Sequence, residues 1–132
     1  MKHAFLIMAH GSLPLLRVLL SMLDDERNDI FLHIDRKSNM LDGAEPLALS
    51  KARLFVLEQR VDVRWGNLSQ IKAEYVLFEE ALKHGPYAYY HLLSGQDLPI
   101  KSQDYIHQFF DEHQGKEFVG INRGEEFEWD FR

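Results

Sequence analysis

Short apolar runs recur along the chain, and each ends in a polar or glycine-containing turn. Runs of this kind, rich in branched and aromatic residues, are typical of strands. The predicted strands cover residues 3–9, 30–34, 54–57, 88–93 and 117–121, and a shorter extended piece covers residues 61–65. Residues 39–52 lack such a pattern, so we expect a loop there with one helical turn at most.

Longer stretches with helix signals separate several of these runs. Pro14 favours the first turn of one helix. Asn67 can cap a second helix, with Gln70 three residues later as in a capping box, and Ser102 can cap a third. The predicted helices cover residues 13–23, 68–84 and 103–113.

The second helix carries an apolar stripe. Its members recur at helical spacing, and we expect them to face the core: Ile71, Tyr75, Phe78 and Leu82. The alternation of strands with helices predicts an α/β fold, in which a largely parallel sheet is flanked by helices and joined by right-handed crossovers.

Composition narrows the function classes. With 132 residues and 45% apolar side chains the chain suits one domain with a real core. A net charge of −6 argues against nucleic-acid binding, which needs a basic face, but a nucleotide pocket needs only local donors. The absence of cysteine excludes disulfides, thiolate metal sites and a cysteine nucleophile. No apolar run is long enough for a membrane span, so we expect a cytoplasmic protein, with peripheral attachment to the inner face of the membrane left open.

Three predicted strand ends carry polar clusters: residues 10–12, 35–37 and 94–97. In a parallel sheet these ends share the edge where ligands bind. Asp35 suits a nucleotide, because its carboxylate can accept from a ribose hydroxyl or a base N–H while the two cations after it face phosphate oxygens. The competing interpretation is that these segments are ordinary solvated turns.

Other site types have weaker support. Residues 10–12 lack a glycine-rich phosphate loop, and no Asp-x-Asp pair follows the second strand. A zinc site from His10, His33 and Asp35 is conceivable, but the spacing matches no known zinc motif, so we expect His33 to be a hydrogen-bonded, partly buried strand residue. Trp65 suits either a stacking platform for a base or sugar or an anchor in the core.

Four blocks of the chain together carry a family resemblance. They are residues 5–10 (FLIMAH), 32–38 (LHIDRKS), 63–69 (VRWGNLS) and 90–101 (YHLLSGQDLPIK). In this order and spacing they resemble the N-terminal half of the core-2/I-branching β-1,6-N-acetylglucosaminyltransferases, the group that also contains the peptide O-xylosyltransferases.

The resemblance implies a GT-A-like, Rossmann-like fold and a glycosyltransferase. Its activity would be inverting transfer of N-acetylglucosamine, or a related sugar, from a UDP-sugar donor to a glycan acceptor, with no cofactor and no divalent metal. The implied uridine-site residues are Ala9, His10, Asp35 and Arg36. Further residues implied on the same donor face are Trp65, Ser69, Ser94, Gln96 and Asp97.

The family's catalytic glutamate and its diphosphate-binding cations lie further along, beyond the position of Arg132. We therefore expect residues 1–132 to be the nucleotide-sugar-binding part of an incomplete domain, lacking the acceptor and catalytic part and inactive alone. The animal relatives' membrane anchor and cysteines are absent, which favours a bacterial enzyme of polysaccharide biosynthesis. The alternative is a non-catalytic nucleotide- or sugar-binding α/β module. A flavodoxin-like signalling domain would need an acidic cluster or a phosphate loop after the first strand, and residues 10–12 are neither.

Overall fold

The computed structural model describes residues 2–64 and 67–113, which divide into two compact units after Leu98. The elements of the first unit are β1 (His3–Ala9), α1 (Leu13–Leu23), β2 (Asn28–Ile34), β3 (Arg53–Val56), α2 (Leu68–His84) and β4 (Tyr89–Ser94). The second unit contains α3 (Gln103–Glu112), which begins at its predicted cap, since the Ser102 hydroxyl accepts from the backbone N–H of Tyr105 at 3.1 Å.

The three predicted helices and the first four predicted strands are confirmed with small changes in their bounds. Residues 61–64 are not assigned to a strand, and residues 39–52 contain turns without a helix. The strand expected at 117–121 lies outside the described residues. No helix within the described residues has the length and apolar character needed to cross a membrane.

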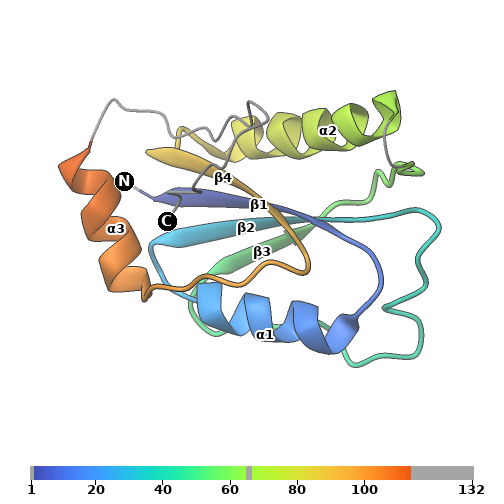
Figure 1. The fold of residues 1–132 in the computed structure, drawn as a ribbon, viewed down its shortest axis with the longest axis horizontal. Coiled ribbons are helices and arrows are strands. Elements are labelled where there is room, and N and C mark those ends of the chain that lie inside the picture. Colours follow the sequence, from blue (N-terminus) through green and yellow to red (C-terminus); the bar gives the residue numbers. More distant parts are fainter. Residues whose placement is uncertain (1, 65–66, 114–132) are drawn as a thin grey trace, which may run out of the picture. The chain divides into compact units, whose positions relative to one another are not determined.

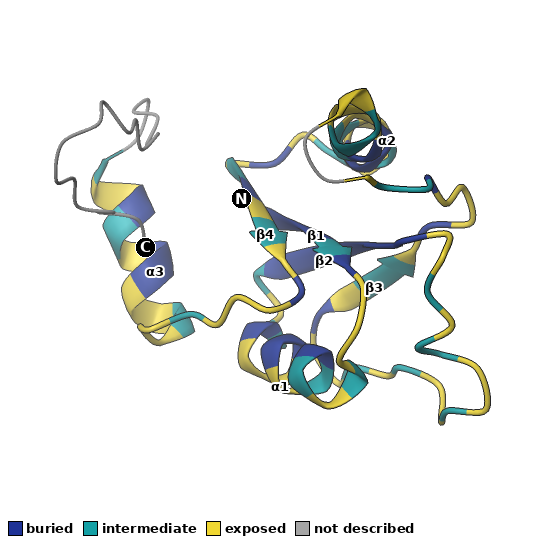
Figure 2. Ribbon diagram, turned by 45° about the vertical axis from the view of Figure 1, so that its right-hand side comes forward, coloured by how far each residue is buried: buried dark blue, intermediate teal, exposed yellow. Residues whose placement is uncertain are grey.

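The sheet has four parallel strands in the order β3-β2-β1-β4, which confirms the α/β prediction (Figure 1). The helices α1 and α2 cover opposite faces of it. Side chains alternate along β1: Phe5, Ile7 and Ala9 join the cluster under α1, whereas Ala4 and Leu6 join the cluster under α2. Both faces of the central strands are therefore buried, and Figure 2 shows β1 and β2 in dark blue.

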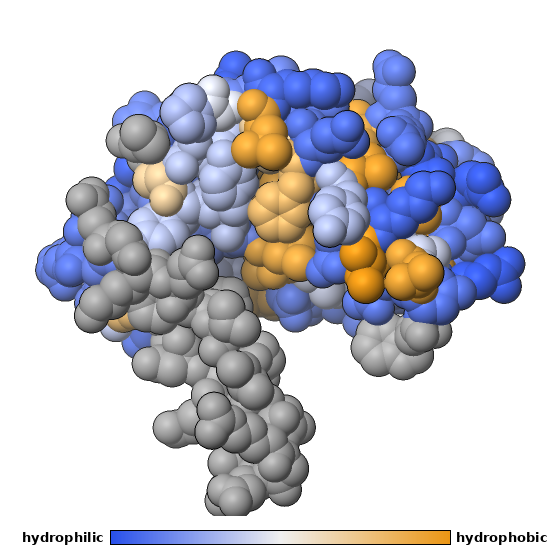
Figure 3. All heavy atoms as spheres, turned by 90° about the horizontal axis from the view of Figure 1, so that it is seen from above, coloured by the Kyte–Doolittle hydropathy of each residue, from blue (hydrophilic) through white to orange (hydrophobic). Residues whose placement is uncertain are grey.

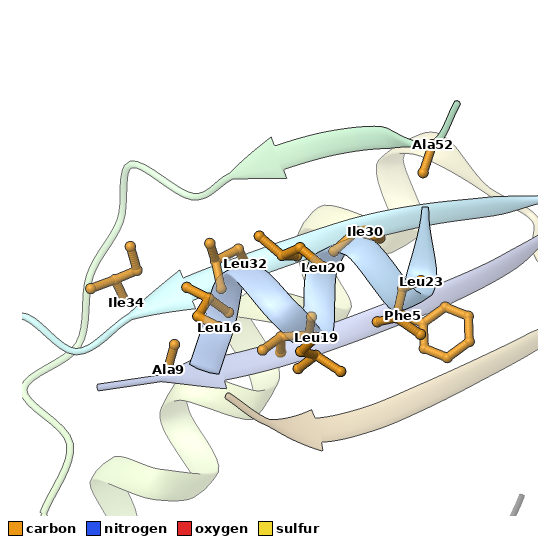
Figure 4. Close-up of a cluster of buried hydrophobic side chains, with 11 residues drawn as sticks. Phe5, Ala9, Leu16, Leu19, Leu20, Leu23, Ile30, Leu32, Ile34 and Ala52 are labelled. Carbon is orange, nitrogen blue, oxygen red and sulfur yellow. The ribbon is translucent and has the colours of Figure 1, made fainter. Parts of the chain in front are cut away.

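The helix α1 packs through one face of leucines. Its N-cap is Ser12, whose hydroxyl accepts from the backbone N–H of Leu15 at 3.3 Å, and Pro14 lies in the first turn as predicted. The leucines of its inner face follow the i, i+3, i+4, i+7 pattern and lie against β1 and β2 (Figure 4): Leu16, Leu19, Leu20 and Leu23. This repeat places a continuous apolar ridge on the sheet.

The helix α2 packs through a different face from the predicted one. Asn67 caps it as expected, but within the described residues Gln70 makes no reciprocal side-chain bond of a capping box. Tyr75 is 70% exposed and Leu82 is 67% exposed, so the expectation that this stripe faces the core is wrong. The residues that face the sheet are instead Ala73, Val76, Leu77 and Ala81.

The small size of two residues on the inner face of α2 explains why this face, and not the predicted stripe, packs against the sheet. Two alanines on the inner face of α2 let the helix backbone approach the sheet closely, whereas large side chains there would hold it away. Phe78 alone of the predicted stripe packs partly against the cluster under α2, near Tyr90 of β4. The exposed members leave apolar surface on α2, and Figure 3, seen from the α2 side, shows orange side chains among hydrophilic ones.

An ionic cluster holds the strands together at their amino ends. The buried Asp29 carboxylate accepts from Lys2 Nζ at 3.1 Å, from Arg53 Nη2 at 2.6 Å and from the Tyr87 hydroxyl at 2.5 Å. Burial raises the pKa of Asp29, but these donors outweigh it and lower the pKa to about 2. Asp29 is therefore ionised in the folded protein at every ordinary pH.

Candidate functional site

The carboxyl ends of β1, β2 and β4 meet at one edge of the sheet, as the sequence predicts. The backbone N–H of Asp35 donates to the Ala9 carbonyl at 2.9 Å, and that of Gly95 donates to the Met8 carbonyl at 2.8 Å. A Cβ on Gly95 would lie 2.9 Å from the Cβ of Ala9, closer than real Cβ atoms approach. Glycine is thus required where the turn after β4 passes the end of β1.

Asp35 is the most organised of the predicted site residues. Its buried carboxylate accepts from the backbone N–H of Lys37 at 3.0 Å, from Lys37 Nζ at 3.0 Å and 3.2 Å, and from the backbone N–H of Val63 at 3.4 Å. Burial raises the pKa of Asp35, but these donors outweigh it and hold the pKa below the ordinary value. The site therefore contains a fixed negative charge at neutral pH.

Lys37 is held by the protein's own carboxylates. Its ammonium also lies 2.7 Å from Asp62 Oδ1 and donates to the Val63 carbonyl. The hydrogen bond with Asp62 is the main cause of the raised pKa of Lys37. The expectation that both cations after β2 face phosphate is therefore wrong for Lys37, which ties the end of β2 to residues 62–63.

Asp62 is a member of the site that the sequence did not single out. Its second oxygen lies 3.2 Å from Arg64 Nη2 and 3.8 Å from Arg36 Nη2, and each of these arginine side chains is 68% exposed. The hydrogen bond from Lys37 is the main cause of the lowered pKa of Asp62. The signal was present in the alternation Val61-Asp62-Val63, which turns the carboxylate away from its apolar neighbours.

Arg60 fixes the backbone under Asp35. Its guanidinium donates to the carbonyls of Ile34 at 3.0 Å, Asp35 at 2.8 Å and Ser38 at 2.6 Å. Three carbonyls at the exit of β2 are thus held by one side chain. No sequence motif marks this arginine, since its role depends on a segment that returns from β3 to the end of β2.

His33 holds the segment that returns from β3 to the end of β2 through a hydrogen bond with Val61. It is fully buried, and its Nε2 accepts a hydrogen bond from the backbone N–H of Val61 at 2.8 Å. Burial is the main cause of its lowered pKa, so the imidazole is neutral, with Nε2 as acceptor. The expectation of a hydrogen-bonded strand histidine is confirmed, and burial is complete rather than partial.

The turn after β4 is held by its own polar groups. The backbone N–H of Ser94 donates to Asp97 Oδ2 at 2.8 Å, and that of Gln96 donates to the Ser94 hydroxyl at 3.2 Å. The side chains of Ser94 and Asp97 therefore shape the turn, and that of Gln96 is exposed beside it. His10 is likewise exposed, at the end of β1.

Ser69 lies in the first turn of α2 and joins the site through Arg64. Its hydroxyl accepts from the backbone N–H of Arg64 at 2.7 Å and lies 3.3 Å from the Arg64 carbonyl, to which it donates. Contacts therefore run from Ser69 through Arg64 and Asp62 to Lys37. Trp65, between them in sequence, lies outside the described residues, so its predicted role stays a prediction.

Comparison with known proteins identifies the family of this chain. A search of curated proteins found no match. The family model described as Core-2/I-Branching enzyme matches residues 3–130, nearly the whole chain and all four blocks of the resemblance. The chain therefore belongs to the Core-2/I-branching enzyme family, a family of glycosyltransferases.

Proposed function

We propose that this chain binds the UDP moiety of a UDP-sugar donor at the carboxyl ends of β1, β2 and β4. The observation that carries the proposal is the buried, ionised Asp35 at this edge of the sheet. Its Oδ1 accepts from three donors, but its Oδ2 accepts only from Lys37 Nζ among the described residues. A carboxylate oxygen has two lone pairs, so Oδ2 keeps an acceptor site for a base N–H or a ribose hydroxyl.

The rim of the site suits the diphosphate. Arg36 and Arg64 share one oxygen of Asp62, while Lys37 occupies the other. With Asp35, the five side chains carry two negative and three positive charges, a local excess of one positive charge in a chain of net charge −6. Exposed guanidinium groups bind phosphate oxygens through paired N–H donors, so these arginines are the residues of this edge best suited to the diphosphate.

The proposed reaction is inverting transfer of N-acetylglucosamine, or a related sugar, to a glycan hydroxyl. A carboxylate base removes the proton of the acceptor hydroxyl as its oxygen attacks the anomeric carbon, and the bond from that carbon to the UDP oxygen breaks. The departing diphosphate is stabilised by cations, and no divalent metal is required in this proposal. This chemistry fits a cytoplasmic enzyme of bacterial polysaccharide biosynthesis.

The two carboxylates of the proposed donor site do not suit the role of catalytic base. Asp35 and Asp62 are both paired with Lys37, which keeps their pKa values low and makes them poor proton acceptors. We therefore expect Asp35 and Asp62 to hold the donor and not to act as the catalytic base. The same observation favours the second candidate, a binding module without catalysis, which measured sugar transfer by the protein would exclude.

Calorimetric titration with UDP, UDP-N-acetylglucosamine and UDP-xylose tests the proposal. We expect binding that EDTA leaves unchanged and that Asp35→Ala weakens about tenfold or more, the effect of losing a charged hydrogen-bond acceptor. The matched control is Glu26→Ala, which removes an exposed carboxylate before the amino end of β2. Absence of binding by a chain that circular dichroism shows to be folded would refute the donor site, and loss with EDTA would refute metal independence.

A further inference from the structure

The outer edge of β3, the last strand of the described sheet, forms one side of a groove that the proposed donor site does not use. The groove has a volume of about 530 Å³ and runs between β3, with the residues directly after it, and one face of α2. Its strand side is residues 54–59, and its helix side is Val76, Glu79, Glu80 and Lys83. The helix residues are spaced i, i+3, i+4, i+7, so a single face of α2 follows the strand.

The backbone of β3 offers hydrogen-bonding groups at this edge. The strand is the last in the order β3-β2-β1-β4, and the N–H of Leu57 donates to the Leu32 carbonyl of β2 at 2.9 Å. In a parallel ladder alternate residues bond to the same neighbour. Residues 55 and 57 therefore face β2, whereas Leu54 and Val56 direct their N–H and C=O groups outward. Within the described residues no hydrogen bond is found for these outward groups.

This edge has little of the protection that usually prevents pairing with another chain. Edge strands are commonly blocked by proline, a bulge or charged side chains. β3 has the sequence Arg-Leu-Phe-Val, and its only charge, Arg53, is held by Asp29. Val56 is 43% exposed, and Figure 2 shows β3 in yellow and teal beside the dark blue β2.

The charges around the groove indicate the kind of occupant. Glu80 is paired with Lys83 at 3.3 Å, whereas Glu58 and Glu79 form no ion pair within the described residues. The apolar floor, which includes Leu57 and Val76, is therefore bordered by two uncompensated carboxylates. A second copy of this chain would bring the same carboxylates against each other, so the charge favours a basic occupant.

We propose that this groove binds an extended basic segment of a partner polypeptide, which adds to β3 as a further strand. Main-chain hydrogen bonds to Leu54 and Val56 supply affinity, and alternate side chains enter the groove. Lysine or arginine side chains of the segment pair with Glu58 and Glu79. This interaction can be tested separately from the donor site, since among the described residues no groove residue forms a hydrogen bond or ion pair with the Asp35 carboxylate.

The test uses the whole chain and a capped synthetic peptide of alternating valine and lysine as the probe. Its matched forms carry glutamate in place of lysine, or N-methyl groups on alternate backbone nitrogens, which prevent strand pairing. We expect fluorescence anisotropy to show binding of the lysine peptide to the chain. The bound peptide is also expected to slow hydrogen exchange at the amides of Leu54 and Val56. The two matched peptides are each expected to bind about tenfold more weakly or worse.

Variants of the chain make the test specific. Glu58→Lys and Glu79→Lys are expected to weaken the lysine peptide about tenfold, whereas Asp42→Lys, in an exposed loop, leaves it within about twofold. Val56→Pro removes an outward N–H without touching the β2 ladder and is expected to abolish binding while the fold remains. Any of three results would overturn the proposal. Asp42→Lys could weaken peptide binding as much as the two glutamate variants do, or the bound peptide could leave hydrogen exchange at Leu54 and Val56 unchanged. The third result is the same slowing of exchange without peptide, caused by self-association of the chain.

Discussion

The ammonium of Lys37 lies 3.0 Å from Asp35, and its other contacts tie the end of β2 to the segment that returns from β3. This relationship fixes the Asp35 carboxylate in its ionised form. It also leaves the exposed arginines, and not the lysine, as the cations available at the sheet edge. The candidate site is thus held by an internal ionic network before any ligand arrives.

Lys37→Met tests this network. Removing the ammonium takes away a donor to Asp35 and the main donor to Asp62, so we expect the pKa of both carboxyls to rise. Carboxyl carbon shifts followed by NMR against pH measure this directly. Arg17→Met, which removes a cation of α1 whose guanidinium bonds to a loop carbonyl, is the matched control and is expected to leave both titrations unchanged. An unchanged titration of Asp35 in Lys37→Met would contradict the network.

Asp29 makes stability depend on pH at the opposite end of the sheet. Its pKa is lowered to about 2 in the folded protein from an ordinary 3.8. Its contribution to the free energy of unfolding is therefore complete well above pH 3.8 and is lost as the pH falls towards 2. A shift of this size corresponds to about 2 kcal/mol. Urea unfolding at pH 7 and pH 3 measures about half of this loss, because pH 3 lies midway between the folded and the ordinary pKa of Asp29. In Asp29→Asn we expect lower stability at pH 7 and a smaller loss on acidification; the same loss as in the original chain would show that another group is responsible.

Gly95 is predicted to be required by its close approach to Ala9. In Gly95→Ala the new Cβ would lie 2.9 Å from the Ala9 Cβ, so the end of β1 or the turn must move. We expect a cost of about 1–3 kcal/mol in unfolding free energy, together with weaker UDP binding. The double variant Ala9→Gly, Gly95→Ala removes the opposing Cβ. If it does not recover part of the lost stability, the close approach is not the cause.

The packing of α2 is tested by two matched truncations. Leu77 is fully buried, so Leu77→Ala is expected to cost about 2–5 kcal/mol in unfolding free energy. Leu82 is 67% exposed, so Leu82→Ala on the same helix is expected to change stability by about 0.5 kcal/mol or less. Chemical unfolding of both variants gives the comparison. Equal costs would mean that the predicted stripe, and not the alanine face, packs in the core.

The sequence predicted elements and topology well because strand and helix signals here are local. Ser12, Asn67 and Ser102 each act within a few residues, and the polar ends of β1, β2 and β4 share an edge once the strands are parallel. The inner face of α2 was missed because large apolar residues dominate a periodicity count, whereas Ala73 and Ala81 fit the space against the sheet.

The site itself was only partly predictable. Asp35 was found from its position after a strand. The roles of Lys37, Arg60 and Asp62 depend on residues 60–64 returning to the end of β2, a contact between segments that no local pattern encodes. The same return buries His33 under Val61.

The most direct test of the donor site follows backbone amides by NMR while UDP is added to the folded chain. We expect the largest shift changes at Ala9, Asp35 and Val63, small changes at Asp29 at the far end of the sheet, and a weaker response in Asp35→Asn at the same UDP concentration. Saturable changes centred elsewhere, or an undiminished response in Asp35→Asn, would contradict a UDP site at this edge.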